Sequence, residues 1–338
     1  AGDVSHGTSL VTLEKGKTAV KLMNAAGYDA FVPGNHDFNY GTARLVELSK
    51  LANFDTIAWN VTTKSTDVLK FAQYTIIEKD GIRYGVFGIS TPETAYKTNP
   101  KNVENVEFKN PIEYAKKAVD VLKQEKCDYI IALSHLGLDE GSEFKSSDIA
   151  YKVPGIDIII DGHSHTKLDS GKVVNGVLIA QTGEHLKNLG TVTIDKQTKK
   201  ISAKLVSAPE LKNYSASEVD KTFASIEGEQ KKILDTVIGK TSVTLDGERE
   251  HVRKGETNLG NLICDALLKE TNADVVLTNG GGIRATIKAG DITKGDVLTV
   301  LPFGNYGITK DVKGSDILAM LEHGVKDYPA TNGGFLHI

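Results

Sequence analysis

Between residues 17 and 180, short apolar runs alternate with amphipathic segments, and this alternation limits the possible folds more than any other feature of the chain. Apolar runs that lack polar alternation indicate strands buried on both faces, and apolar residues at three- and four-residue spacing indicate helices. The expected strands are 30–32, 56–60, 128–133, 156–160 and 177–180, and the expected helices are 17–26, 41–50 and 111–124. Residues 74–90 predict a hairpin that turns at Lys79-Asp80-Gly81. This pattern predicts an α/β fold with a sheet covered on both faces.

The residue pattern of the chain changes after Pro209. Residues 217–235 are polar, charged and helix-like, which is typical of a connecting helix. Beyond them a second α/β segment is expected, with strands 237–245, 273–278, 297–301 and 306–312 and helices 257–269 and 315–325. We therefore predict two domains, residues 1–208 and a smaller one at 237–338, joined through a connecting helix in 209–236.

Charge, hydropathy and cysteine content give no indication of a nucleic-acid-binding surface, a membrane-spanning segment or a disulfide. Lys plus Arg total 40 and Asp plus Glu total 44, so the net charge of −4 does not favour a broad nucleic-acid surface. No apolar run is long enough to span a bilayer. Cys127 and Cys264 each lie in an apolar-periodic segment and are interpreted as buried thiols, not as a disulfide or a metal site.

Side chains that can bind a metal or carry a proton follow the ends of several expected strands. Ligand sites in parallel sheets lie outside the carboxyl ends of the strands, so these side chains should meet at one rim. They are Asp3, Asn35, His36, His135, His163 and His165. A single histidine after a strand is most often a solvated loop residue, but four such strand ends in one sheet are hard to ascribe to chance.

The chemistry of these ligand atoms limits the choice of metal ion. Imidazole and oxygen donors without a thiolate suit Zn, Mn, Fe, Co or Ni. Asp3 could bridge two ions through its two oxygens. Two ions about 3.5–4 Å apart would polarise a water and clamp the oxygens of an in-line displacement.

Four motifs, "GDVSHGT", "GNHDF", "SHLG" and "GHSHT", resemble those of the calcineurin-like metallophosphoesterases. The resemblance implies an αββα-type sandwich and two divalent metal ions, Zn, Mn or similar. It implies that Asp3 bridges both ions, that His165 binds one of them, and that the other is bound by Asn35, His135 and His163. It also implies that His36 acts on the transition state and is not a ligand.

The chain departs from this family pattern at two places. The family's opening Asp-x-His motif, which would precede Asp3, does not appear in the sequence, so one metal site is expected to be incomplete in this chain. In addition, Asn39 stands where many relatives have an Asp that orients the catalytic histidine. An amide there can accept a hydrogen bond from His36 through its oxygen, but it cannot stabilise an imidazolium by charge.

Three motifs in the second half, "ETNLGNLICDA", "NGGGIR" and "LPFGN", resemble the C-terminal domain of the 5′-nucleotidase family. Taken alone, "NGGGIR" is either an anion-binding turn or an ordinary glycine-rich turn with a surface arginine, and Phe303 alone would be a core residue. The resemblance implies that a nucleotide is held by Arg253, Asn279, Gly280 and Arg284 and that Phe303 stacks on its base. Thr257 or Asn258 is expected to cap the helix that follows.

The resemblance implies a nucleotide phosphatase of the 5′-nucleotidase type, acting through a water activated by a dinuclear metal site. Its partner would be a nucleotide and not nucleic acid, at an extracellular, cell-surface or periplasmic location. Asn39 favours 2′,3′-cyclic-nucleotide 2′-phosphodiesterase with 3′-nucleotidase activity, "LPFGN" favours 5′-nucleotidase, and UDP-sugar hydrolase stays open. The missing Asp-x-His motif favours a catalytically impaired nucleotide-binding module. "AGDVSHGT" and "GGFLHI" indicate a piece of a longer protein, cut at both ends.

Overall fold

The chain divides into two compact units. The computed structural model describes residues 1–64 and 71–338. The N-terminal unit comprises Ala1–His6 and Lys15–Ala224, and the C-terminal unit comprises Gly7–Glu14 and Ser225–Ile338. The division falls inside helix α7 (Ser217–Leu234). The short segment that contains α1 (Ser9–Thr12) groups with the C-terminal unit, where α1 contacts α10 (Lys294–Val300).

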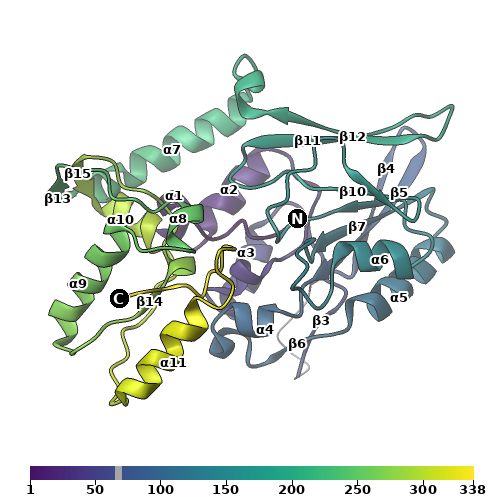
Figure 1. The fold of residues 1–338 in the computed structure, drawn as a ribbon. Helices are drawn as coiled ribbons and strands as arrows, with labels where there is room; N and C mark the ends of the chain where they lie inside the picture. Colours follow the sequence, from purple (N-terminus) through teal and green to yellow (C-terminus); the bar gives the residue numbers. More distant parts are fainter. Residues whose placement is uncertain (65–70) are drawn as a thin grey trace. The chain divides into compact units, whose positions relative to one another are not determined.

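A mixed six-stranded sheet forms the centre of the N-terminal unit (Figure 1). Its strands in spatial order are β4 (Tyr74–Lys79), β5 (Ile82–Ser90), β7 (Tyr129–His135), β8 (Ile158–Ile160), β10 (Val177–Ala180) and β9 (Lys172–Val174). The four inner strands are parallel, and both edge strands pair antiparallel. The hairpin β4–β5 is confirmed, and Asp80 and Gly81 at its turn both have positive φ, as a type I′ turn requires.

Both faces of the central strands are covered, as their continuous apolar runs predict. Phe87 of β5 and Ala132 of β7 pack in the cluster that includes helix α5 (Pro111–Gln124) and helix α6 (Ser146–Lys152). The neighbouring residues Val86 and Leu133 pack in a separate cluster. Side chains alternate across a strand, so the sheet contributes to two cores.

The helices of the N-terminal unit follow the predicted periodicity. In α5, Asn110 accepts hydrogen bonds from the N–H groups of Ile112 and Glu113, and residues at three- and four-residue spacing are buried. The predicted helices 17–26 and 41–50 are confirmed as α2 (Lys17–Ala25) and α3 (Thr42–Leu51). The other described helices of this unit are α4 (Thr94–Lys97) and the 3₁₀ helices η1 (Asn35–Phe38), η2 (Pro100–Val103) and η3 (Ala208–Leu211).

Smaller sheets complete this unit. Strand β1 pairs parallel with β2, and β3 pairs antiparallel with β6. The hairpin β11–β12 was not among the predicted strands; its residues alternate between exposed and partly buried positions. The bounds of these strands are β1 (Ala30–Phe31), β2 (Asp55–Thr56), β3 (Val61–Thr63), β6 (Val106–Phe108), β11 (Asn188–Ile194) and β12 (Ile201–Ser207).

The C-terminal unit is built on two short antiparallel pairs, β13–β15 and β14–β16. Its core residues are Leu245, Val252, Leu259, Ile263, Ile283, Ile287 and Val300. Its remaining elements are β13 (Val237–Thr241), α8 (Arg249–Val252), α9 (Asn258–Thr271), β14 (Thr278–Asn279), η4 (Gly280–Gly282), β15 (Gly290–Thr293), α11 (Gly314–Gly324) and β16 (Leu336–His337). Thr257 caps α9 by accepting a hydrogen bond from the N–H of Gly260, as expected.

Several predicted strands of this unit are wrong. Residues 297–301 fall at the end of helix α10, which Thr293 begins by accepting a hydrogen bond from the N–H of Asp296. A short apolar run does not distinguish a strand from a buried helical turn, and the cap decides. Residues 306–312 form no strand in the described chain and are exposed. The strand expected at 237–245 shortens to β13, and of the strand expected at 273–278 only Thr278 lies in a strand, β14.

The two-domain α/β class, with mixed sheets covered by helices, is confirmed. Among the residues that the structure describes, no helix combines the length and the apolar character needed to cross a membrane. Cys264 is buried and Cys127 is only partly buried, and both are unpaired thiols within the described chain.

Candidate functional site

Three of the predicted metal ligands meet in the N-terminal unit. One ligand atom from each of Asp3, His135 and His163 lies within 4.8 Å of the other two. His135 is the last residue of β7, and His163 lies in the loop after β8. These two strands are parallel neighbours, so their carboxyl ends carry both imidazoles to the same edge.

The loop that carries Asn35 packs directly against this group. A Cβ atom on Gly34 would lie 2.2 Å from Asp3 Oδ1 and 2.6 Å from His135 Nε2, so only glycine allows this approach. Asn35 is buried, and its Oδ1 atom has no hydrogen-bond partner among the described residues. An unpaired buried amide oxygen beside a carboxylate and two imidazoles is the kind of atom that a cation would satisfy.

The contact between His135 and Asp3 gives the same indication. His135 Nδ1 lies 2.5 Å from the carbonyl oxygen of Ala1, to which its N–H donates. In the neutral ring Nε2 then carries the lone pair, and it lies 3.1 Å from Asp3 Oδ2 without the geometry of a hydrogen bond. Two facing lone pairs repel unless a proton or a metal ion lies between them. The residues present therefore fit a divalent cation.

The pKa values of the two groups reflect the same close contact. Burial lowers the pKa of His135, but the neighbouring carboxylate of Asp3 more than offsets it, and the net direction is upward. Burial raises the pKa of Asp3, yet the charge of the neighbouring His135 ring and the hydrogen bond from the backbone N–H of His36 bring it well below its usual range. The two groups thus shift each other's pKa in opposite directions, as a carboxylate and an imidazole ring in close contact do.

The side chains of His36 and Asn39 are in contact. Asn39 Oδ1 accepts a hydrogen bond of 2.9 Å from Thr98 Oγ1, so the amide group turns its Nδ2 atom to His36 Nδ1 at 3.1 Å. The Asn39 oxygen, which could have accepted from His36, accepts from Thr98 instead. An N–H donor at Nδ1 makes that nitrogen the acceptor and leaves the ring proton on Nε2. The ring of His6, which the sequence reasoning did not select, stacks on His36 with centroids 5.8 Å apart.

Asp37 organises the loops and was not predicted as a site residue. It is 1% exposed, and its carboxylate accepts five hydrogen bonds. The donors are the N–H groups of Gly34, Asp3, Val4 and Ser5 and the hydroxyl of Ser5. Burial raises the pKa of Asp37, as does the charge of Asp3, while these hydrogen bonds act in the opposite direction. Asp37 thereby ties the segment that carries Asp3 to the one that carries Asn35 and His36.

Glu93 was also missed. It follows β5 by three residues, so the strand-end rule that selected the histidines would have found it. Its Oε2 atom lies 3.0 Å from His163 Nε2 and 2.7 Å from Lys97 Nζ. Burial raises the pKa of Glu93, but the hydrogen bonds to His163 and Lys97 outweigh burial and lower it to about 2.

His165 is not part of the three-residue group around Asp3. Its Nδ1 atom lies 2.8 Å from Glu184 Oε2, and its backbone has a positive φ of 56°. Burial raises the pKa of Glu184, but the neighbouring histidines His185 and His165 and then Lys187 reverse this, and the net direction is downward. The structure thus places His165 beside a carboxylate that the sequence reasoning did not select.

The predicted substrate residues of the C-terminal unit form two groups. Asn279 Nδ2 donates to the carbonyl oxygen of Gly333, and the carbonyl oxygen of Arg253 accepts from Asn332 N–H. Residues 332–335 therefore connect Arg253 with Asn279, and Gly280 N–H donates to the carbonyl of Phe335.

Arg284 and Phe303 make the second group. The guanidinium carbon of Arg284 lies 5.4 Å from the ring centroid of Phe303, and Nη1 donates to the carbonyl of Gly281. Phe303 is half-buried and follows helix α10, not a strand as expected.

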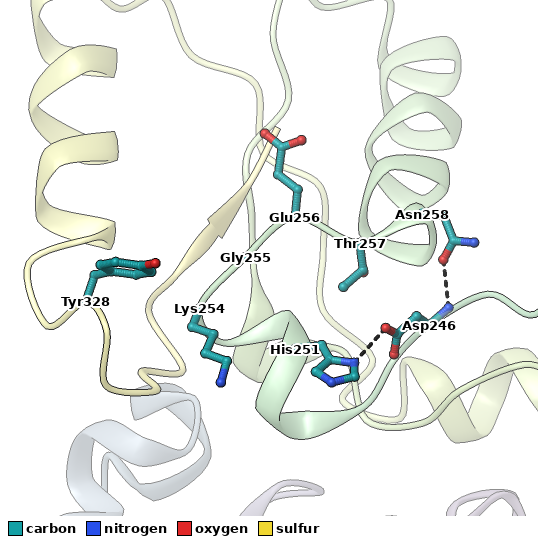
Figure 2. A pocket seen from close by; sticks show the side chains of 8 residues that line it. All are labelled: Asp246, His251, Lys254, Gly255, Glu256, Thr257, Asn258 and Tyr328. Atoms are coloured by element: carbon teal, nitrogen blue, oxygen red, sulfur yellow. Dashed lines mark hydrogen bonds and ion pairs between the residues drawn. The ribbon is translucent and has the colours of Figure 1, made fainter.

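A separate hollow of about 580 Å³ lies in the same unit (Figure 2). His251 Nδ1 contacts Asp246 Oδ2 at 2.7 Å on its wall. The described residues that line it include none of the predicted substrate residues; they are Asp246, His251, Lys254, Gly255, Glu256, Thr257, Asn258 and Tyr328. The hollow carries both signs of charge and is not the predicted base site.

Two families match successive parts of this chain. Calcineurin-like phosphoesterase matches residues 1–167, and the 5′-nucleotidase C-terminal domain matches residues 237–338. The trifunctional nucleotide phosphoesterase protein YfkN of Bacillus subtilis is 34% identical over 99% of this chain, which spans 26% of that protein. The 5′-nucleotidase of Vibrio cholerae is 30% identical over 99% of this chain, which spans 68% of that protein.

A solved structure agrees with these matches. The crystal structure of the 5′-nucleotidase precursor from Thermus thermophilus has a TM-score of 0.84 and 34% identity, and the match covers 99% of this chain and 70% of that one. The resemblance read from the motifs is confirmed. The chain belongs to the 5′-nucleotidase family, with a calcineurin-like phosphoesterase domain followed by a 5′-nucleotidase C-terminal domain.

Proposed function

We propose that this protein is a metal-dependent hydrolase that removes phosphate from nucleotides, an activity of the 5′-nucleotidase type. The observation that carries the proposal is the meeting of ligand atoms from Asp3, His135 and His163 within 4.8 Å. Membership of the 5′-nucleotidase family supports the nucleotide as substrate.

Four residues would hold one ion: Asp3, Asn35, His135 and His163. The unpaired Oδ1 of Asn35 and the lone pair of His135 Nε2 support this set. Asp3 and His165 would contribute to a second ion. Divalent ions in such sites supply Lewis acidity toward phosphoryl oxygens and a nucleophile at neutral pH. The protein must hold these ligand atoms in place. Asp37 does so for the segment that carries Asp3, because its carboxylate accepts hydrogen bonds from the backbone of that segment.

His36 would act as a hydrogen-bond donor to the phosphoryl group. The amide of Asn39 donates to Nδ1, so the ring proton of His36 lies on Nε2. A neutral imidazole with that proton can stabilise negative charge as it grows on a phosphoryl oxygen. The backbone of His36 also helps to hold Asp3 beside this segment, because the backbone N–H of His36 donates to Asp3 Oδ1 at 2.8 Å.

The nucleotide itself would be held by the C-terminal unit. Arg253 and Arg284 carry the positive charge that an anionic nucleotide requires, and Asn279 and Gly280 shape the turn beside them. Phe303 would stack on the base, and the guanidinium of Arg284 at 5.4 Å orients its ring. The half-buried state of Phe303, which lies outside the core of this unit, supports a contact role.

One alternative has an observation in its favour. Asn39, whose amide contacts His36 Nδ1 at 3.1 Å, favours 2′,3′-cyclic-nucleotide 2′-phosphodiesterase with 3′-nucleotidase activity. The relative from Bacillus subtilis is itself described as a trifunctional nucleotide phosphoesterase. A panel of AMP, 2′,3′-cyclic AMP, 3′-AMP and UDP-glucose separates these activities, and the proposal expects AMP to give the highest kcat/KM.

Metal content tests the mechanism independently. Four donors hold a transition metal far more firmly than two, so the donors of residues 1–338 alone should retain about one equivalent through exhaustive dialysis, as measured by elemental analysis. A second equivalent should bind weakly, and activity should rise with excess metal. Two firmly held equivalents would mean that other residues complete the second site. A protein with no metal and no turnover of any of the four substrates would be the nucleotide-binding module of the alternative.

The proposal extends to location. A nucleotide phosphatase of this family would act at an extracellular, cell-surface or periplasmic site. Fractionation of the producing cells with an antibody against this protein tests it, and an exclusively cytoplasmic signal would contradict it.

A further inference from the structure

Glu93 lies beside the candidate metal ligands and has no role in the account above. Its side chain is 7% exposed, and that of His163 is 6% exposed. Glu93 Oε2 receives three contacts, from His163 Nε2 at 3.0 Å, Lys97 Nζ at 2.7 Å and Ser142 Oγ at 3.4 Å. The backbone N–H of Glu93 donates to Thr91 Oγ1, which fixes the start of α4. A buried carboxylate is thus held by several donors against one imidazole.

These contacts determine which nitrogen of His163 carries the proton. An ionised carboxylate only accepts hydrogen bonds, so Nε2 must be the N–H that faces Glu93. Lys97 Nζ also lies 3.2 Å from Nε2. If Nε2 instead accepted a hydrogen bond from Lys97, its lone pair would face the carboxylate oxygen 3.0 Å away, which is repulsive. The neutral ring therefore keeps its lone pair on Nδ1.

We propose that Glu93, secured by Lys97, is a positioning residue for the metal site and makes Nδ1 the ligand atom of His163. Histidines that bind metals commonly donate their second ring N–H to a carboxylate, which orients the ring and raises its basicity. Lys97 balances the charge of Glu93, so the arrangement adds no net charge next to Asp3. This inference rests on the proposed function only in assuming that the group of Asp3, His135 and His163 binds a divalent ion.

Metal affinity tests the role of Glu93 without any measurement of turnover. Metal-free protein is titrated with Mn²⁺ by calorimetry in the wild type and in Glu93→Ala, Glu93→Gln and Glu47→Ala. Removal of such a partner typically weakens metal binding about 10- to 100-fold, and we expect this range for Glu93→Ala. Glu93→Gln should weaken binding less, because its amide oxygen still accepts from Nε2. Glu47→Ala is the matched control, since it also removes a glutamate and an ion pair, with Arg44 at 2.9 Å.

The outcomes separate this inference from the proposed function. A wild type that binds no Mn²⁺ refutes the proposed function and this inference with it. A wild type that binds Mn²⁺, with unchanged affinity in Glu93→Ala, overturns the role of Glu93 and leaves the proposed function standing.

A second measurement does not depend on whether a Glu93 variant folds. In metal-free wild-type protein labelled with ¹⁵N-histidine, the ring of His163 should show the tautomer protonated on Nε2, with the signal assigned by its loss in His163→Gln. A ring protonated on Nδ1 alone would overturn the inference, because that nitrogen could not then be the ligand atom.

Discussion

Replacing Asp37 by Asn should destabilise the N-terminal unit far more than an isosteric change usually does. Oδ1 of Asp37 accepts from Val4 N–H, Ser5 N–H and Ser5 Oγ at 2.7–3.0 Å, and Oδ2 accepts from Asp3 N–H and Gly34 N–H at 2.7 and 2.8 Å. An amide retains one oxygen, and its NH₂ group would face donors at the other position.

The magnitude follows from the bonds that are lost. If the amide oxygen takes the place of Oδ1, the two bonds to Oδ2 disappear. Hydrogen bonds to a charged group contribute about 1.5–3 kcal/mol each, so the loss is about 3–6 kcal/mol. The substitution also removes the cost of burying the charge of Asp37 and then its repulsion from Asp3, the two causes that raise the pKa of Asp37, and this offsets part of the loss. We therefore expect a decrease of about 3 kcal/mol in the free energy of unfolding, the lower end of that range.

Unfolding in urea, followed by tryptophan fluorescence, measures this decrease for the N-terminal unit. The protein has one tryptophan, and Trp59 lies 7% exposed in the core of the N-terminal unit, so its fluorescence reports that unit. The protein should be metal-free, because a bound ion would add its own stabilisation. With an m value of about 3 kcal/mol/M, the urea midpoint should fall by about 1 M. Ser5→Ala is the control; it removes one of the five bonds and, at the same lower end of the range, should cost about 1.5 kcal/mol. Equal midpoints for Asp37→Asn and Ser5→Ala would refute the reasoning.

Three further predictions concern the two units. Phe303→Ala should lower kcat/KM for a nucleotide by an amount equivalent to the roughly 1–3 kcal/mol of base stacking and should spare a simple aryl phosphate; equal losses on both would make Phe303 a structural residue. His36→Asn should keep the metal content found by elemental analysis and lower kcat with little change in KM, whereas loss of metal would show that His36 is a ligand. Burial raises the pKa of Asp157 despite the hydrogen bond from Ile130 N–H, so the fold favours its protonated form and loses stability as the pH rises through the folded pKa. Asp157→Asn should therefore be more stable than wild type near neutral pH and equal to it below the unfolded pKa; a difference that does not change with pH would contradict this.

The parts of the fold that could be predicted are those with long, regular patterns. Helix α5 combines a capping asparagine, a proline in its first turn and apolar residues at helical spacing, and these signals agree with one another. Strands β5 and β7 are buried on both faces, so their apolar runs are continuous. In the C-terminal unit the apolar runs are short, and Val297 to Val300 became a helical turn because Thr293 and Asp296 cap it. Local sequence does not resolve such cases, because the cap and the packing partner decide them.

The candidate site divides in the same way. Residues at strand ends could be selected from sequence, because parallel neighbouring strands carry their carboxyl ends to one edge whatever the loops do, and His135 and His163 meet there. Glu93 follows the same rule, three residues after β5, although only the residues near the other strand ends were selected. Asp37 lies within the motif "GNHDF", but four of the five hydrogen bonds to it come from residues more than 30 positions away in the chain, so its role could not be predicted from the local sequence.

By itself, the sequence determined the class of fold, the family and the kinds of ligand atom available, because apolar periodicity and residue chemistry are properties of the chain. Only the tertiary structure decided how those atoms are used. Asn39 donates to His36 because Thr98, 59 positions away, occupies its oxygen, and Glu93 faces His163 across 70 positions. The direction of a hydrogen bond depends on every partner around a group, and those partners come from distant segments that only folding brings together.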